Sequence, residues 1–529
     1  MTILQRLGIV IVIFVVVLGT RQLRLSRRRR RFDRGRKLAS KQPKRAAGEY
    51  RWGSLKIPKS AATQHFLVVG TTGSGKSMVQ RMLMKDVFAE FGTGNDSRAL
   101  VFDAKNDAAA FLKHIRLPVP IYSLHPFDSR RSFPHAVAWD IAADVTCPAR
   151  ALNLAACLLP VEKGGGNRYF TDAARQVVGA VIESLIRHSP LDWTFSDFVY
   201  AALSQDRIRQ VLSRDPVGHE TLDNFLGDER TGYQVFTTIA SRMSYFRPVA
   251  ALWQRATAKL SLRDWLSTDS VLLFGMDATA RIALDAINEI MFRILVEEID
   301  MQADSRSRRT WIWIDEARLA GPILRADLLP YLAAKGRSRG ACLVLAFQDI
   351  EGFREASGPR VANEIIAQCS HKALLRMEAE ESAEWASKLL GQYETIQELK
   401  SYKGGFFDDG SSSEQFCKRE AVLPTEFYLI PPSDARNGLT GFFVAPTGGA
   451  VRGTVSRSSL QSVFIPEEVA NRYRLIRRNE SDQCLLPWNS VEIRKHGSNP
   501  TPTTKPSGKS PALKLRKNAS RDRPLTTND

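Results

Sequence analysis

The chain has 529 residues, of which 43% are apolar, enough to bury about two or three hydrophobic cores, so a mainly disordered protein is excluded. Its formal net charge of +19 comes almost entirely from residues 21–45 and 485–529, because the part from residue 46 to residue 484 is formally neutral. The 6 cysteines include no CxxC pair and have no histidine at ligand spacing, which indicates a reduced cytosolic body and argues against a zinc site.

The first predicted element is a membrane helix within residues 1–20. Residues 7–18 form an unbroken apolar run, which Gly19 and Thr20 extend up to Arg21. At about 1.5 Å per helical residue, residues 7–20 reach about 21 Å, so they span a bilayer core only if residues 3–6 contribute, with Arg6 snorkelling to the interface. A cleaved signal peptide is the alternative, but no small-residue cleavage site follows.

A basic linker is expected over residues 21–50, with consecutive arginines at residues 27–31. Positive charge next to a membrane helix predicts that the chain beyond it stays in the cytoplasm. Such a cluster also binds anionic lipid headgroups. A purely topological role for these arginines is the alternative.

The most specific motif of the chain is a phosphate-binding loop. It follows the apolar run at residues 66–69 without a break, which places it on a strand end as a P-loop requires. Glycines let backbone N–H groups curl around phosphate oxygens, the lysine reaches the β and γ phosphates, and the serine hydroxyl holds Mg2+. The pattern predicts binding of ATP and Mg2+ by Gly70, Thr71, Thr72, Gly73, Ser74, Gly75, Lys76 and Ser77.

Short apolar runs alternate with amphipathic segments from residue 52 onward, the pattern of a parallel α/β sheet. The spacing predicts strands at residues 66–70, 99–104, 119–123, 270–275, 310–315, 341–347 and 371–377. A helix with one apolar face is expected at residues 283–303. The fold class is therefore predicted to be α/β.

A long stretch without a strand separates the third predicted strand from the fourth. It is too long for a loop, and its apolar residues recur at helical spacing. We therefore predict a nucleotide-binding domain in two parts, residues 51–150 and 264–480, interrupted by an all-α domain at residues 151–263. Residues 481–529 are rich in Pro, Ser, Thr and Lys, which predicts a disordered basic tail.

A pair of acidic residues supplies what a nucleotide hydrolase needs besides the P-loop. Asp315 and Glu316 stand at the end of the fifth predicted strand, after the run WIWI. Asp315 is expected to hold the Mg2+ shell, and Glu316 to orient and polarise the attacking water. A solvated acidic strand end is the alternative.

Two further side chains are candidates for the same site. Gln348 follows the next predicted strand, where it would lie beside the nucleotide and sense the γ phosphate; a surface glutamine is the alternative. Arg337 and Arg339 stand in a turn flanked by glycines, from which one of them would reach a neighbouring subunit's nucleotide as an arginine finger. Two solvated surface arginines are the alternative.

In this order the motifs resemble those of TraD/TrwB-type coupling proteins, the membrane-anchored DNA-pumping ATPases of conjugative type IV secretion. The likeness covers roughly residues 50–450. It comprises WGSLKIP before FLVVGTTGSGKS, then VFDAKNDAAAFL, SLHPFDSRRSFPHAVAWDI, NRYFTDAARQVV, LLFGMDA, WIWIDEARLAG, LAAKGRSRGACLVLAFQDI and CSHKALLRMEAEESAEWASKLLG. The HPFD element followed by YFTDAAR and the AFQ strand is more specific than the P-loop and the acidic pair, which many ATPases share.

The resemblance implies a RecA-like motor domain with an inserted all-α domain facing the cytoplasm, a homo-hexameric ring, and an ATP hydrolase that moves single-stranded DNA and also binds double-stranded DNA. The implied partners are a relaxase, other relaxosome proteins, the type IV secretion channel and anionic lipid of the bacterial inner membrane, which the chain would cross once. Carried over by position, Lys76 and Ser77 are the P-loop ligands, Asp315 and Glu316 the acidic pair, and Gln348 the motif after it.

Two features depart from that family. Its members usually have two membrane helices, whereas one short helix is visible here, and the tail is basic, unlike the acidic relaxosome-binding tails of some members. Two other functions compete. A receptor that uses nucleotide only to set its assembly is disfavoured by the water-activating Glu316, and an FtsK-type chromosome translocase is disfavoured by the composition of the chain after residue 481.

Overall fold

A computed structural model gives the fold and describes residues 49–130, 133–161, 168–325, 328–401, 411–434, 437–446, 449–497 and 516–517. The predicted membrane helix, nearly all of the basic linker and the arginines at residues 27–31 lie outside these ranges. Within them, no helix combines the length and the apolar character that crossing a bilayer requires.

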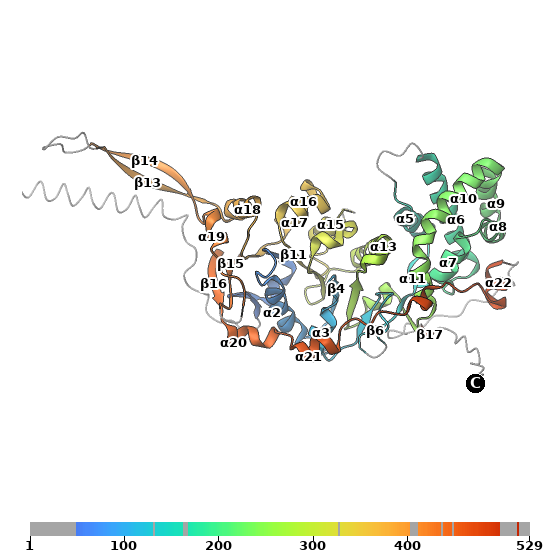
Figure 1. The fold of residues 1–529 in the computed structure, drawn as a ribbon, viewed down its shortest axis with the longest axis horizontal. Helices are drawn as coiled ribbons and strands as arrows, with labels where there is room; N and C mark the ends of the chain where they lie inside the picture. Colours follow the sequence, from blue (N-terminus) through green and yellow to red (C-terminus); the bar gives the residue numbers. More distant parts are fainter. Residues whose placement is uncertain are drawn as a thin grey trace, which may run out of the picture.

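A 10-stranded sheet forms the centre of the molecule, in the order β16-β15-β12-β3-β11-β10-β4-β9-β5-β6 (Figure 1). Neighbouring strands from β12 to β6 run parallel, whereas β15 and β16 are antiparallel additions at one side. The strands are β3 (Phe66–Val69), β4 (Ser97–Asp103), β5 (Ile121–Ser123), β6 (His135–Ala136), β9 (Val271–Gly275), β10 (Arg309–Ile314), β11 (Ala341–Phe347), β12 (His371–Leu374), β15 (Leu439–Ala445) and β16 (Gly449–Val455). Each predicted strand is present, and the α/β prediction is confirmed.

Helices cover both faces of the sheet, which is why its strands read as continuous apolar runs. Trp311 and Trp313 of β10 stack on one face with ring centroids 4.9 Å apart, packed among α2, α3 and the hairpin of β1 (Glu49–Trp52) and β2 (Leu55–Pro58). Ile312 and Ile314 point to the other face. The covering helices are α2 (Lys76–Phe88), α3 (Ala108–His114), α13 (Arg281–Met301), α14 (Gly321–Arg325), α15 (Leu328–Lys335), α16 (Ile350–Ser357), α17 (Pro359–Gln368), α18 (Glu380–Leu390) and α19 (Pro424–Tyr428).

A helical insert lies between β7 (Ala138–Trp139) and β8 (Ala258–Leu260), which pair in parallel. Its helices are α4 (Ile141–Asp144), α5 (Pro148–Leu158), α6 (Arg168–His188), α7 (Phe195–Ala202), α8 (Gln205–Leu212), α9 (Pro216–Leu226), α10 (Glu229–Met243) and α11 (Arg247–Gln254). β8 is a strand inside the range 151–263 that was predicted to be all-α, and it forms by pairing with β7, the strand before the insert. One hydrophobic core continues from the sheet into these helices, so the division into domains stays a prediction.

The C-terminal part of the chain runs along the body from the sheet to the insert (Figure 1). Residues 464–497, called the C-terminal strap below, include α21 (Glu467–Arg472) against α3 and α22 (Ser490–Gly497) against α6 and α8. The prediction of disorder is wrong for residues 481–497, because Trp488 and His496 are buried in this packing. Most of the remaining tail lies outside the described residues.

The HPFD element fastens the strap to the sheet. The buried Asp128 forms a two-pronged ion pair with Arg130, whose guanidinium also donates to the Tyr473 carbonyl oxygen at 2.7 Å. The backbone N–H of Arg478 donates to the Phe127 carbonyl oxygen at 3.0 Å. This motif therefore has a structural use in anchoring the strap.

An antiparallel hairpin projects from the opposite end of the molecule, beyond α18 and α19 (Figure 1). Its strands are β13 (Gln392–Ser401) and β14 (Ser411–Glu420), paired along their full length. No strand was predicted for this segment, since its residues lack a strand-like alternation of apolar and polar side chains.

Candidate nucleotide-binding and hydrolytic site

The P-loop lies at the carboxyl end of β3 and leads directly into α2. Gly73 and Gly75 have φ angles of +77° and +97°, in the left-handed region that residues with a side chain rarely adopt. A Cβ atom on Gly75 would also lie 2.3 Å from a methyl carbon of Leu439. Glycine is thus required at both positions for the turn into the helix.

The start of α2 fits an anionic ligand. Gly75 precedes the helix and offers no capping side chain, so the first N–H groups of the helix lack that acceptor. The hydroxyl of Ser74 is buried and has no hydrogen-bond partner among the described residues. Donors of this kind, aligned with the positive end of the helix dipole, are the groups that bind phosphate. The residues present therefore fit a nucleotide phosphate.

Lys76 is held inside the loop. Its ammonium group donates to the carbonyl oxygens of Gly70 at 2.7 Å and of Thr71 at 3.1 Å. Burial lowers the pKa of Lys76 below its ordinary value, although the negative charge of Glu316 opposes this shift. The ammonium therefore lies where phosphate oxygens would compete with the two carbonyls.

Asp315, which follows β10, lies close to Ser77 in the first turn of α2. The ammonium of Lys105, from the turn after β4, is 2.8 Å from Asp315 Oδ2 and 3.5 Å from Ser77 Oγ. The Gln80 amide donates to Asp315 Oδ1 at 2.8 Å. Neither Lys105 nor Gln80 was predicted from the sequence. Burial opposes the charge of Lys105, but the attraction of Asp315 outweighs it, and the pKa of Lys105 is raised.

A divalent ion at this point would have few protein ligands. Across the described ranges, the acidic, histidine and cysteine side chains form no group of 3 or more that could hold a metal ion. Mg2+ usually binds through one or two protein oxygens and takes its other ligands from phosphate and water. Ser77 and Asp315 fit that donor set.

Gln348 connects the P-loop with Glu316. Its amide nitrogen donates to Glu316 Oε2 at 3.1 Å, and its amide oxygen accepts from Thr72 Oγ1 at 3.3 Å. β11 lies between β3 and β10 in the sheet, so a residue at its carboxyl end emerges midway between the two motifs. The structure thus brings the predicted P-loop, acidic pair and glutamine to one edge of the sheet.

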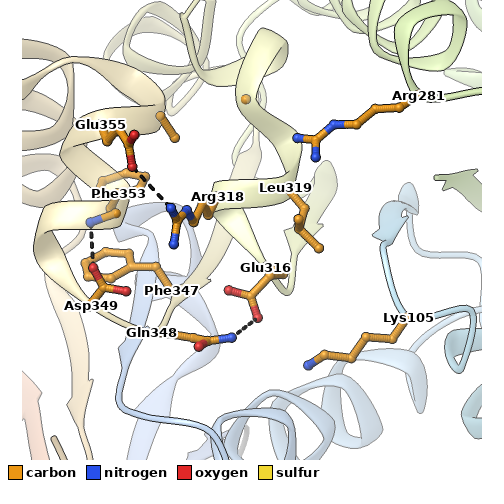
Figure 2. A pocket seen from close by; sticks show the side chains of 13 residues that line it. Lys105, Arg281, Glu316, Arg318, Leu319, Phe347, Gln348, Asp349, Phe353 and Glu355 are labelled. Atoms are coloured by element: carbon orange, nitrogen blue, oxygen red, sulfur yellow. Dashed lines mark hydrogen bonds and ion pairs between the residues drawn. The ribbon is translucent and has the colours of Figure 1, made fainter. Parts of the chain in front are cut away.

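A cavity of about 760 Å³ opens beside Glu316. Figure 2 shows Lys105 and Arg281 pointing into it from one side, with Asp349 and Glu355 on the other. Arg318, also in its wall, forms an ion pair with Glu355 at 3.2 Å. The cavity therefore has charged walls of both signs and adjoins the carboxylate predicted to activate water.

Asp103, at the end of β4, caps a helix. Its two carboxylate oxygens accept from the backbone N–H groups of Asp107 and Ala108, each at 3.1 Å, at the start of α3. Burial, with the nearby charge of Asp107, raises the pKa of Asp103 to about 7. The structure thus shows Asp103 as the cap between the end of β4 and the start of α3.

The two candidate finger arginines lie at the opposite, amino edge of the sheet, in the turn before β11. Arg339 is tied to its own chain, through an ion pair with Asp300 at 3.2 Å and a hydrogen bond to the Gln302 carbonyl oxygen at 3.2 Å. Arg337 is exposed, and within the described ranges no hydrogen bond or ion pair holds its guanidinium. The structure does not bring Arg337 to the P-loop of its own chain.

The motifs at this sheet edge occur together in a known family. The family model described as the type IV secretion-system coupling protein DNA-binding domain matches residues 49–448. The chain belongs to this coupling-protein family. The resemblance to TraD/TrwB-type coupling proteins is thereby confirmed, and the match extends over both parts of the sheet and the helical insert.

Individual members of the coupling-protein family agree with this assignment. The coupling protein TraD of Escherichia coli (strain K12) is 22% identical over 387 residues, which are 71% of this chain and 50% of TraD, so the chain spans about half the length of that relative. Unbound TrwBΔN70, a bacterial conjugative coupling protein, has a TM-score of 0.60 at 17% identity and covers 78% of this chain and 90% of its own. TrwB in complex with ADP and Mg2+ has a TM-score of 0.59 at 17% identity, covering 80% and 93%. At these identities, the structures show a shared fold.

Proposed function

We propose that this coupling-family protein is an ATP-driven DNA translocase, anchored in the bacterial inner membrane, that couples a relaxase with its single-stranded DNA to a type IV secretion channel. The observation that carries the proposal is the position of Gln348 between Thr72 and Glu316, because it links the phosphate-binding loop to a carboxylate suited to activate water. A receptor that used nucleotide only to set its assembly would not need that carboxylate. The complex of the related TrwB with ADP and Mg2+ supports the choice of cofactors.

Each predicted site residue has a role in this proposal. The P-loop amides and Lys76 bind the ATP phosphates, while Ser77 and Asp315 hold Mg2+. Bound Mg2+ would supply neutralisation of the phosphate charge. Glu316 orients the water and accepts its proton. Gln348 positions Glu316, and it shifts when a phosphate binds beside Thr72.

Arg337 is proposed as the finger that acts on a neighbouring chain, within the homo-hexamer that the family resemblance implies. Its guanidinium is exposed at the amino edge of the sheet, whereas Arg339 is occupied by Asp300. A finger stabilises charge on the transferred phosphoryl group, so it needs a guanidinium that no partner in its own chain holds. This choice between the two arginines goes beyond what the sequence offered.

DNA-stimulated ATP hydrolysis tests the proposal. Lys76→Ala should lower it by at least about a hundredfold through lost phosphate binding, and Glu316→Gln by a similar factor with nucleotide still bound. Lys388→Ala removes an exposed lysine from a surface ion pair on α18 and should leave hydrolysis unchanged. Undiminished hydrolysis in Lys76→Ala would contradict the proposed ATP-driven translocase. Normal DNA transfer with Glu316→Gln would instead favour the receptor.

A further inference from the structure

Lys105 occupies the position between the two proposed metal ligands. Its ammonium is 2.8 Å from Asp315 Oδ2 and 3.5 Å from Ser77 Oγ. Asp315 Oδ1 is already taken by Gln80 at 2.8 Å. Both carboxylate oxygens of Asp315 therefore have a donor, and the one that faces Ser77 is held by a positive charge.

A divalent ion and this ammonium exclude each other. Both would lie between the same two oxygens, and like charges at such a separation repel strongly where solvent screening is incomplete. Asp315 is shielded enough for this to matter, since its side chain is only 22% exposed. Binding a metal at Ser77 and Asp315 thus requires the Lys105 ammonium to leave.

The structure also offers the ammonium a place to go. The Lys105 side chain is 43% exposed and comes from a turn rather than a helix or strand. It also forms part of the wall of the cavity beside Glu316, which leaves the ammonium room to move away from Asp315 (Figure 2). Rotation of this flexible side chain into the cavity needs no change in the sheet.

We propose that Lys105 is a built-in substitute for the divalent ion: its ammonium holds Ser77 and Asp315 when no metal is bound between them, and it is displaced when Mg2+ binds with the nucleotide. This inference rests on the proposed function, because it takes Ser77 and Asp315 as the metal ligands. It follows that Lys105 weakens the binding of a metal ion without nucleotide. When metal is withheld, its charge instead partly replaces the metal next to bound phosphates.

Binding of Mn2+ alone, measured by electron paramagnetic resonance on the full chain, tests the first consequence. Lys105→Ala should bind Mn2+ about three- to tenfold more tightly than the native protein, because no ion pair has to be broken. Lys105→Met keeps the aliphatic stem and should behave in the same way, so a folding defect in one variant does not decide the result. Adding Asp315→Asn should remove the gain. Equal or weaker Mn2+ binding in both Lys105 variants would overturn the inference.

Binding of fluorescent ADP, with Mg2+ or with EDTA, tests the second consequence. Relative to the native protein, Lys105→Ala should bind ADP about three- to tenfold more tightly with Mg2+ and about three- to tenfold more weakly in EDTA. Lys388→Ala is the matched control and should change neither value. If Lys76→Ala abolishes binding while Lys105→Ala keeps the native ratio of the two affinities, only the role of Lys105 fails. If Lys76→Ala leaves binding intact, the proposed nucleotide site itself fails.

Discussion

The proposed connection between nucleotide and water depends on one amide side chain, that of Gln348. Gln348 accepts from Thr72 at 3.3 Å and donates to Glu316 at 3.1 Å, both longer than the most favourable hydrogen bonds. A phosphate that binds beside Thr72 therefore changes the first contact at little cost. Because both contacts involve the same planar amide, the change is passed on to Glu316.

Replacing Gln348 with alanine should slow ATP hydrolysis by about ten- to hundredfold, because Glu316 loses the amide that orients it. Nucleotide affinity should change by less than about threefold, since the P-loop amides and Lys76 are untouched. Steady-state kinetics and fluorescent ADP binding measure the two effects. Gln254→Ala, which removes a glutamine bound to the strap at Leu486, is the control. An unchanged turnover number would contradict the role of Gln348.

The sequence predicted the site residues that belong to contiguous motifs and missed two that do not. Lys105 reaches Asp315 only because β4 lies beside β10, a pairing that no local pattern reveals. Gln80 was within reach, because it follows Lys76 by one helical turn and so shares its face of α2. Lys105 was thus missed because the order of the strands in the sheet cannot be read from the sequence, whereas the spacing of Gln80 from Lys76 could have revealed it.

At the element scale, a buried histidine fixes the start of the P-loop strand. His65, just before β3, accepts from the backbone N–H of Leu343 with Nδ1 at 3.1 Å and lies 2.8 Å from the Ala333 carbonyl oxygen with Nε2. The first contact requires an unprotonated Nδ1, and the second requires a hydrogen on Nε2, so the neutral ring satisfies both. Burial lowers the pKa of His65 to about 4.

Acid should therefore destabilise the sheet before carboxylates are protonated. In the unfolded chain the pKa of His65 returns to its ordinary value of 6.5, so the unfolded state binds the proton more tightly. The stabilisation is fully present above about pH 6.5 and is lost as the pH falls towards about 4. Urea unfolding should show a free energy of unfolding about 1–2 kcal/mol lower at pH 5 than at pH 7.5 from this group.

Two variants separate His65 from other titrating groups. His65→Gln should be less stable than the native protein at pH 7.5, yet should lose less stability between pH 7.5 and pH 5. His219→Gln changes an exposed histidine on α9 and should leave the native difference unchanged. The explanation is wrong if His65→Gln keeps the full pH dependence. His371, whose pKa burial also lowers to about 4, would account for the part that persists.

Strands were predictable from the sequence where both faces of the sheet are buried. The parallel strands were found because they lie between helix layers and are apolar throughout, as in the run Ile312 to Ile314. β8 was missed because it is short and forms only by pairing with β7, which is distant in the sequence. The hairpin of β13 and β14, which projects from the body in Figure 1, was missed because its sequence shows no strand-like alternation of apolar and polar residues.

At the scale of the whole molecule, the C-terminal strap joins the sheet to the insert. It is fixed to the HPFD element at Arg478 and to α11 at Leu486, whose N–H donates to Gln254 at 2.9 Å. It ends with Trp488 and His496 buried against the insert. A change in the position of the insert must therefore be accommodated by the strap.

Trp488→Ala should destabilise the insert by about 3–5 kcal/mol, as expected for truncation of a large buried ring. Hydrogen exchange should accelerate in α7 and α8, because Trp488 lies 5.2 Å from the Tyr200 ring and α22 packs on α8. Fluorescent ADP affinity should stay native. Ile493→Ala, at a side chain 48% exposed on the same helix, is the control and should cost little. Native exchange rates in both helices would show that the strap is not an anchor.

The order of the strap was not predicted because the residues that it contacts are distant from it in the sequence. Residues 481–497 were grouped with the tail that follows, because residues 481–529 as a whole are rich in Pro, Ser, Thr and Lys. Their order depends on Trp488 and His496, whose partners on the insert lie far away in the chain. Composition measures the average burial that a segment can achieve, whereas a few well-placed anchors are enough to hold it.

The P-loop and Arg337 stand at opposite edges of one sheet, and this fixes the polarity of any assembly that uses both. In the proposed arrangement, the amino edge of one chain meets the carboxyl edge of the next. A two-fold dimer cannot do this, because it places identical surfaces against each other. Each nucleotide is then contacted by two chains, one through its P-loop and the other through Arg337. Hydrolysis therefore requires the interface between chains and is not a property of one chain by itself.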